Sequence, residues 1–206
     1  MARARPALLT VALSGAAVLG YLVYRVTSAP DATPTADPAA DDTPVVEQLA
    51  EKLPDFSLAD LEGNPKSIQS WPGKPLIINF WATWCGPCLR EIPMLKDFQK
   101  AHGGDIQVVG IAVDRHDPVV QFAGKMQFNY PILQGENEAW QAAAQFGVDF
   151  YALPFTVFTA GDGTVLGVHT GELAPEHLEN LTATLADLDA GTITASQARE
   201  RLAGLL

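Results

Sequence analysis

The stretch Leu76–Cys88, LIINFWATWCGPC, joins a run of large side chains to both cysteines of the chain. Its first part, Leu76–Trp81, is a short apolar run typical of a buried strand. The segment Gly86–His102 that follows has the apolar spacing expected of an amphipathic helix. The sequence therefore predicts that Cys85 and Cys88 lie where a buried strand gives way to a helix.

Two thiols at the start of a helix have a defined chemistry. Positions three apart share a helical face, so the two sulfurs can reach each other. Unpaired amides at a helix N-terminus stabilise a thiolate on Cys85, which makes it the attacking sulfur, while Cys88 is placed to resolve the mixed disulfide. Pro87 fits the first turn, where a missing amide hydrogen costs nothing. We expect an exposed Cys85 and a buried Cys88.

Three other uses of paired cysteines match this sequence poorly. A structural zinc site needs four ligands, and no metal-ligand spacing relates the cysteines to the histidines, which are His102, His116, His169 and His177. Covalent haem attachment needs a histidine directly after the second cysteine, where Leu89 stands. Two inert buried cysteines fit poorly with Gly-Pro between them at a strand-to-helix junction. A redox pair is the favoured interpretation.

Apolar runs and amphipathic stretches alternate along the rest of the chain. Further strands are predicted at Ile106–Val113, Phe155–Thr159 and Val165–His169. Further helices are predicted at Pro118–Phe128, Glu138–Phe146, Pro175–Leu188 and, amphipathic and shorter, at about Ala195–Leu205. The last of these could pack on the domain or on a partner. Alternating strands and helices favour an α/β sheet with helices on both faces.

The N-terminal region differs from the rest in composition. Residues Ala7–Tyr24 carry no formal charge, and as a helix they would span about 27 Å, close to the hydrocarbon thickness of a bilayer. Arg3 and Arg5 precede this run and Arg25 follows it, which favours a cytoplasmic N-terminus and an exported domain. We predict a cytoplasmic stub at 1–6 and a transmembrane anchor at 7–26. A cleaved signal peptide ending in Thr27-Ser28-Ala29 is the alternative.

Composition bounds the remainder of the chain. Residues 27–43 are Pro, Ala, Asp, Thr and Ser, which predicts a flexible tether. A globular domain is expected at 44–190 and a helical tail at 191–206.

The 24 acidic and 13 basic residues give a net charge of -11, which leaves no electrostatic footprint for nucleic acid. Two cysteines cannot build a disulfide-stapled scaffold, but 48% hydrophobic residues suffice for a core.

The motif FWATWCGPC, the later Pro93 and the Leu153-Pro154 pair before a strand resemble the thioredoxin-fold proteins. Two further segments, Lys52-Leu-Pro-Asp-Phe-Ser-Leu58 and the Cys-Leu-Arg-Glu-Ile-Pro stretch from Cys88, resemble the anchored TlpA and ResA type of thiol-disulfide oxidoreductase. The resemblance implies a thioredoxin-like α/β fold, with a central mixed β-sheet, helices on both faces and a subfamily insertion of an extra strand and helix within 114–147.

The resemblance also implies roles for individual residues. Cys85 and Cys88 match the redox pair, and Trp84 the aromatic residue that flanks it. Pro154 matches the cis-proline that faces the disulfide, which would leave the backbone of Leu153 free to pair with a substrate chain and discourage metal capture. Pro93 matches the proline that kinks the active-site helix.

One departure concerns the proton relay. Thioredoxin has a buried Asp six residues before its first cysteine, and here Asn79, which cannot titrate, takes that place. Glu91 matches the acidic residue of the TlpA and ResA type and lies three residues after Cys88, on the same helical face. We expect Glu91 to take over the proton transfer. The alternative is a solvated surface glutamate.

Together these features predict a thiol-disulfide oxidoreductase of the bacterial cytoplasmic membrane, with its catalytic domain in the periplasm or extracytoplasmic space. It would need no cofactor. It would reduce disulfides of exported partners, such as apocytochrome c or copper-site proteins, and would be re-reduced by a membrane-embedded thiol donor, since an oxidising compartment drives the pair to the disulfide.

Two alternative functions use the same fold. A copper-transfer module would hold Cu(I) by Cys85 and Cys88, with His169 as a third ligand. Copper carriers of this fold, however, space their cysteines by three residues. A peroxidase usually has Pro and Thr upstream of the attacking cysteine, where Ile78 and Ala82 stand here, so we expect no peroxide turnover.

Overall fold

The computed structural model describes residues 49–147 and 152–203. The strands are β1 (Ser57–Ala59), β2 (Pro65–Ser67), β3 (Leu76–Trp81), β4 (Gln107–Val113), β5 (Ile132–Gly135), β6 (Phe155–Thr159) and β7 (Val165–Thr170). The helices are α2 (Gly86–His102), α3 (His116–Met126), α4 (Asn137–Ala144), α5 (Pro175–Asp189) and α6 (Ala195–Ala203). The predicted stub, anchor and tether, 1–43, lie outside this part of the chain. In the part that is described, no helix has the length and apolarity needed to cross a membrane.

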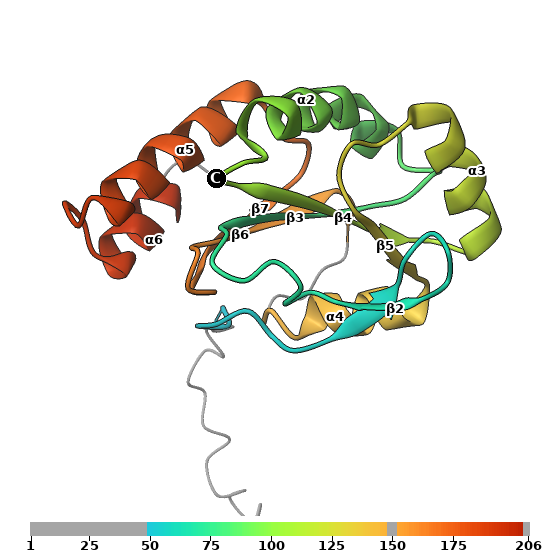
Figure 1. The fold of residues 1–206 in the computed structure, drawn as a ribbon, viewed down its shortest axis with the longest axis horizontal. Coiled ribbons are helices and arrows are strands. Elements are labelled where there is room, and N and C mark those ends of the chain that lie inside the picture. The colour runs from blue at the N-terminus through green and yellow to red at the C-terminus, as the bar shows by residue number, and fades with distance from the viewer. Residues whose placement is uncertain (1–48, 148–151, 204–206) are drawn as a thin grey trace, which may run out of the picture. The chain divides into compact units, whose positions relative to one another are not determined.

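The strands form one mixed sheet in the order β2-β1-β5-β4-β3-β6-β7. Strands β3, β4 and β5 are parallel, and all other neighbouring pairs are antiparallel. Figure 1 shows α2 over one face of the sheet and α4 over the other. The predicted thioredoxin-like α/β fold with a mixed sheet and helices on both faces is confirmed.

The central strand β3 is buried over its whole length because both faces of the sheet are covered. Ile77 and Trp81 belong to the core beneath α2 and α5, whereas Ile78 and Phe80 belong to the core beneath α4. This alternation follows from the two-residue period of a strand. Asn79 lies two residues after Ile77, so its side chain points to the same face of the sheet, the one that α2 covers.

Several predicted elements are confirmed with small changes in their bounds. Strands β3 and β6 and helix α2 have the predicted bounds, while β4 begins one residue later than predicted, at Gln107. Helix α3 begins at His116 rather than Pro118, because a proline is tolerated in the first helical turn. The segment assigned to an insertion, 114–147, contains α3, β5 and α4.

Strands β1 and β2 were not predicted. Each has three residues, and their sequences, SLA and PKS, carry little apolar signal. They are held as a hairpin by the Asp60 carboxylate, which accepts hydrogen bonds from the amides of Glu62 at 3.0 Å and Asn64 at 2.8 Å. Gly63 adopts a φ of 84° in this turn, a conformation that favours glycine.

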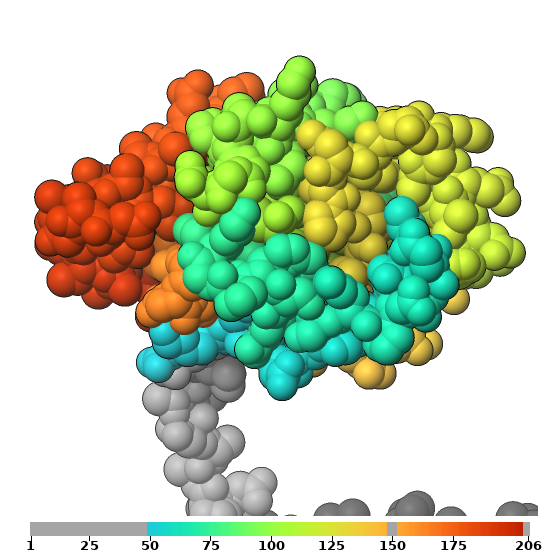
Figure 2. Space-filling model, in the orientation of Figure 1, coloured from blue at the N-terminus to red at the C-terminus, as the bar shows by residue number. Residues whose placement is uncertain are grey.

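The C-terminal helix α6 packs on the domain, the first of the two predicted alternatives. Ala198 and Leu202 are fully buried in the core shared with α5, and Figure 2 shows this red segment at one end of the domain. Arg199 donates hydrogen bonds to the carbonyls of Val165 at 2.7 Å and Glu51 at 3.0 Å. The Glu51 carbonyl also accepts the amide of Val165, on edge strand β7, at 3.1 Å. Helix α6 is described as far as Ala203.

Candidate active site

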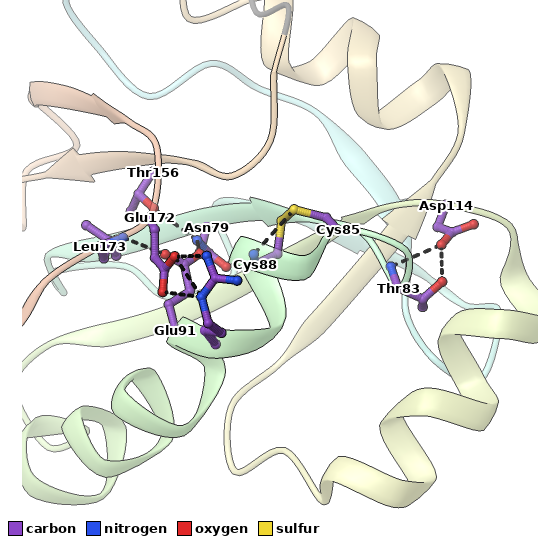
Figure 3. The surroundings of a disulfide bond; sticks show 10 residues. Asn79, Thr83, Cys85, Cys88, Glu91, Asp114, Thr156, Glu172 and Leu173 are labelled. Atoms are coloured by element: carbon purple, nitrogen blue, oxygen red, sulfur yellow. Dashed lines mark hydrogen bonds and ion pairs between the residues drawn. A yellow bond between two sulfur atoms is a disulfide. The ribbon is translucent and has the colours of Figure 1, made fainter.

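Cys85 and Cys88 form a disulfide at the N-terminus of α2 (Figure 3). Cys85 is the N-cap residue, with an extended backbone at φ -88° and ψ 101°, and its Sγ accepts a hydrogen bond from the Cys88 amide at 3.3 Å. Pro87 lies in the first turn, as expected. In the reduced protein the same amide and the positive end of the helix dipole favour a thiolate on Cys85.

The exposure of the two cysteines differs from the sequence prediction. Cys88 is fully buried, as predicted, but Cys85 is also buried, with only 5% of its surface exposed. Its sulfur is bonded to Cys88 and accepts the Cys88 amide at the end of the helix. The neighbouring Trp84 is instead 68% exposed. The predicted exposed Cys85 is therefore wrong for the oxidised form.

Glu91 is buried beneath the disulfide, with 2% of its surface exposed. One carboxylate oxygen accepts a hydrogen bond from the side-chain amide of Asn79 at 2.7 Å, and the other accepts the backbone amide of Leu173 at 2.7 Å. The same Asn79 amide also donates to the hydroxyl of Thr156 at 3.0 Å (Figure 3). The alternative of a solvated surface glutamate is wrong.

Burial changes the acidity of this carboxyl group. Desolvation raises the pKa of Glu91 from 4.5 to about 7, and the negative charge of Glu172 adds to this rise. The hydrogen bonds from Leu173 and Asn79 stabilise the ionised form and act in the opposite direction. A carboxyl group with this pKa can both accept and release a proton near neutral pH.

A loop between β7 and α5 closes over Glu91. The Arg90 guanidinium binds the Glu172 carboxylate through Nε, at 3.0 Å from each oxygen, and through a second nitrogen. Glu91 follows Arg90 on the helix and Leu173 follows Glu172 in the loop, and these two residues form the hydrogen bond described above. Gly171, in the same loop, donates its amide to the Pro154 carbonyl at 2.9 Å. These contacts could not be predicted from the sequence, because they join residues far apart in the chain and no nearby motif indicates them.

On the other side of the disulfide, Asp114 fixes the turn that precedes Trp84. Its carboxylate accepts the Thr83 amide at 3.1 Å and also the Thr83 hydroxyl. Asp114 follows the end of β4, which lies beside β3 in the sheet. The sequence alone indicated no role for Asp114. A polar residue directly after a buried parallel strand was the available signal, since such strand ends meet at one edge of the sheet.

The peptide bond between Leu153 and Pro154 is cis, as the resemblance implied. Pro154 is buried and Leu153 is half-buried. Their predicted contact with a substrate backbone, and the predicted kink at Pro93, which lies within α2, stay predictions.

His169 is engaged away from the cysteines. Its Nε2 lies 3.2 Å from the Glu172 carbonyl, an acceptor, so this nitrogen carries the hydrogen. Its ring lies 4.2 Å from that of His177. Across residues 49–147 and 152–203, no group of three or more His, Cys, Asp or Glu side chains is arranged to hold a metal ion. The proposed third copper ligand is thus not brought to the cysteine pair.

Comparisons with known proteins agree with this fold and site. The Redoxin family model matches residues 48–185. The chain is 31% identical over 173 residues to the thiol-disulfide oxidoreductase ResA of Geobacillus thermodenitrificans, covering 80% of this chain and 88% of that protein. It is 32% identical over 139 residues to the thioredoxin-like protein YneN of Bacillus subtilis, covering 64% and 77%.

A solved structure of a thiol:disulfide interchange protein of the thioredoxin family, from Chlorobium tepidum, superimposes with a TM-score of 0.59. The identity is 27%, and the match covers 67% of this chain and 97% of that one. Fold, disulfide and sequence together define a thioredoxin-like protein-disulfide oxidoreductase. The chain belongs to the Redoxin family, and within it to the thioredoxin-fold oxidoreductases of the TlpA and ResA type.

Proposed function

We propose that this protein is a membrane-tethered, exported reductase for disulfides of partner proteins. The observation that carries the proposal is the Cys85–Cys88 pair at the N-terminus of α2, with the buried carboxyl of Glu91 one turn further along the same helix. An activated sulfur, a resolving sulfur and a proton-transfer group with a pKa of about 7 are the parts that dithiol-disulfide exchange requires.

The reaction proceeds in two exchanges. The Cys85 thiolate attacks a partner disulfide, an intermolecular S–S bond forms, and the first partner sulfur leaves as a thiolate that takes a proton. Glu91 then accepts the Cys88 proton, directly or through one water. The Cys88 thiolate attacks Cys85, the second partner sulfur leaves and is protonated, and the intramolecular disulfide forms again. Two electrons and two protons pass to the partner.

The site has to be re-reduced before the next turnover. We assign this step to a membrane-embedded thiol donor, because an extracytoplasmic compartment favours the disulfide. The predicted anchor 7–26, with its uncharged run Ala7–Tyr24, supports the assignment, since it would hold the domain beside such a donor. Suitable partners are exported proteins with a disulfide to be opened before cofactor insertion, such as apocytochrome c or copper-site proteins.

Trapping of mixed disulfides tests the proposal. In native cells the Cys88→Ser variant should accumulate covalent complexes with exported proteins, because the resolving sulfur is missing. The Cys85→Ser variant serves as the matched control and should capture none. A reduction potential as oxidising as about -120 mV, that of a strong thiol oxidant, would overturn the direction of transfer. Equal complexes with both variants would overturn the assignment of Cys85.

A further inference from the structure

Two consecutive residues of α2 contact two consecutive residues of the β7–α5 loop. Arg90 binds Glu172 by its side chain, and Glu91 accepts the backbone amide of Leu173. The first contact is largely exposed, with 63% of the Arg90 side chain accessible, whereas the second is buried. We call this pair of contacts the clasp.

The geometry of the outer contact is better than that of most surface ion pairs. Isolated exposed pairs contribute little, but a fork of guanidinium nitrogens on one carboxylate has directional hydrogen bonds and resists rearrangement. Because Glu172 directly precedes Leu173, fixing the Glu172 side chain limits the movement of the Leu173 amide. The same loop donates the Gly171 amide to the Pro154 carbonyl.

We propose that Arg90 and Glu172 are positioning residues, whose ion pair holds the β7–α5 loop closed so that the Leu173 amide stays on the Glu91 carboxylate. The inference deepens the proposed proton-transfer role of Glu91 and rests on it only for the effect on turnover. The clasp itself is a property of the isolated protein.

The other groups around Glu91 do not substitute for the clasp. Asn79 is neutral and reaches the carboxylate from the sheet, and its side-chain amide is shared with the hydroxyl of Thr156. Tyr130, which precedes β5, is buried, and the charge of Glu91 adds to the desolvation that raises the pKa of its phenol. Glu172 is the charged group of the loop, and its own charge opposes ionisation of Glu91. Only the Leu173 amide links the loop to the carboxylate as a donor that stabilises the anion.

Replacement of the arginine by lysine separates geometry from charge. Lysine keeps the positive charge at position 90 but cannot form the fork. We expect Arg90→Lys to raise the pKa of Glu91 by about half a unit and to speed hydrogen exchange at the Leu173 amide by about five-fold. The first is measured by NMR titration of ¹³C-labelled glutamate, and the second by amide exchange, both on the oxidised protein without any partner.

Three further proteins complete the experiment. The charge reversal R90E should speed Leu173 exchange and raise the pKa of Glu91 further than Arg90→Lys does, because it also adds negative charge beside that carboxyl group. The double variant R90E/E172R should restore protection of the Leu173 amide. The control Lys100→Met removes a positive charge from the far end of α2 and should change neither quantity. Unchanged Leu173 exchange and an unchanged Glu91 titration in Arg90→Lys would overturn the clasp. Because no partner takes part, this result is independent of the trapping experiment.

Turnover gives a second readout. If Glu91 transfers the proton, the pH profile of disulfide reduction in Arg90→Lys should move to higher pH by about half a unit. This shift should equal the shift in the pKa of Glu91 found by titration. A shifted titration with an unshifted rate profile would retain the clasp and remove Glu91 from the rate-limiting proton transfer.

Discussion

The side-chain amide of Asn79 donates a 2.7 Å hydrogen bond to the carboxylate of Glu91, so a strand residue and a helix residue share the buried polar position beneath the disulfide. Thioredoxin has its acid on the strand. Here the strand supplies a neutral donor and the helix supplies the acid. The carboxyl group therefore lies one helical turn from Cys88, with one hydrogen-bond partner, Asn79, on the sheet and the other, the Leu173 amide, in the β7–α5 loop.

Stability should depend on pH through Glu91. A carboxyl group with a raised pKa binds its proton more tightly in the folded protein, so its contribution is complete below about pH 4.5 and is lost as the pH rises through about 7. The loss amounts to about 3 kcal/mol. The Glu91→Gln variant should lack this loss, and urea unfolding at several pH values measures it. The exposed-residue control Glu179→Gln should keep the wild-type slope, and an unchanged slope in Glu91→Gln would contradict the prediction.

A second carboxylate at position 79 should be costly above neutral pH. In Asn79→Asp the two acids would lie within hydrogen-bond distance and could not both ionise, so the pair would retain one proton at pH 7. We expect a loss of about 1 to 3 kcal/mol in unfolding free energy at pH 8 and a much smaller loss at pH 5. Equal losses at both pH values would show that the two carboxyl groups do not interact.

Alkylation should distinguish the two sulfurs. In the reduced protein iodoacetamide should modify Cys85 well before Cys88, because Cys85 caps the helix and Cys88 is fully buried. Mass spectrometry of peptides after short exposure gives the ratio, which we expect to exceed about ten to one. Faster modification of Cys88 would reverse the assigned roles.

Trp84 should act on partners rather than on the fold. Its side chain is 68% exposed, so Trp84→Ala should change the unfolding free energy by less than about 0.5 kcal/mol. Loss of its apolar surface beside Cys85 should raise KM for a protein disulfide by about ten-fold, with little change in kcat. The matched control is Val120→Ala, at another exposed apolar side chain. The same KM change in both variants would argue against a specific contact at Trp84.

The N-terminal segment should determine location. The full chain should sediment with membranes and resist alkaline extraction, whereas a chain starting at Pro44 should remain in the soluble fraction. A membrane-impermeant maleimide should modify the reduced cysteines in intact spheroplasts if the domain is exported. Modification only after lysis would contradict export, and release of the full chain by alkali would favour the cleaved signal peptide.

The elements around the disulfide could be predicted because their signals are local. The apolar run of β3, the Gly-Pro between the cysteines and the amphipathic pattern of α2 lie within one continuous stretch, Leu76–His102. The residues that complete the site are distant in sequence. Leu173 lies 82 residues from Glu91, and it contributes a backbone amide, which no side-chain pattern reveals.

The burial of Cys85 and the short strands β1 and β2 could not be predicted, for other physical reasons. The burial of Cys85 follows from how the disulfide packs in three dimensions, with its sulfur bonded to Cys88 and accepting the Cys88 amide at the helix end. Strands β1 and β2 are too short to show a period, and they depend on the pairing of β1 with β2 and with β5 at the edge of the sheet. The role of Asp114 likewise appears only when β4 lies beside β3.

The contacts of Arg199 and Glu51 with Val165 have a consequence for how copies of this domain coexist. An open strand edge invites another chain to extend the sheet, which is a route to aggregation. At Val165 of β7, the amide is already bonded to Glu51 and the carbonyl to Arg199 of the terminal helix. A neighbouring molecule therefore finds the Val165 end of this edge already occupied, and the sheet cannot be extended there without first breaking these bonds.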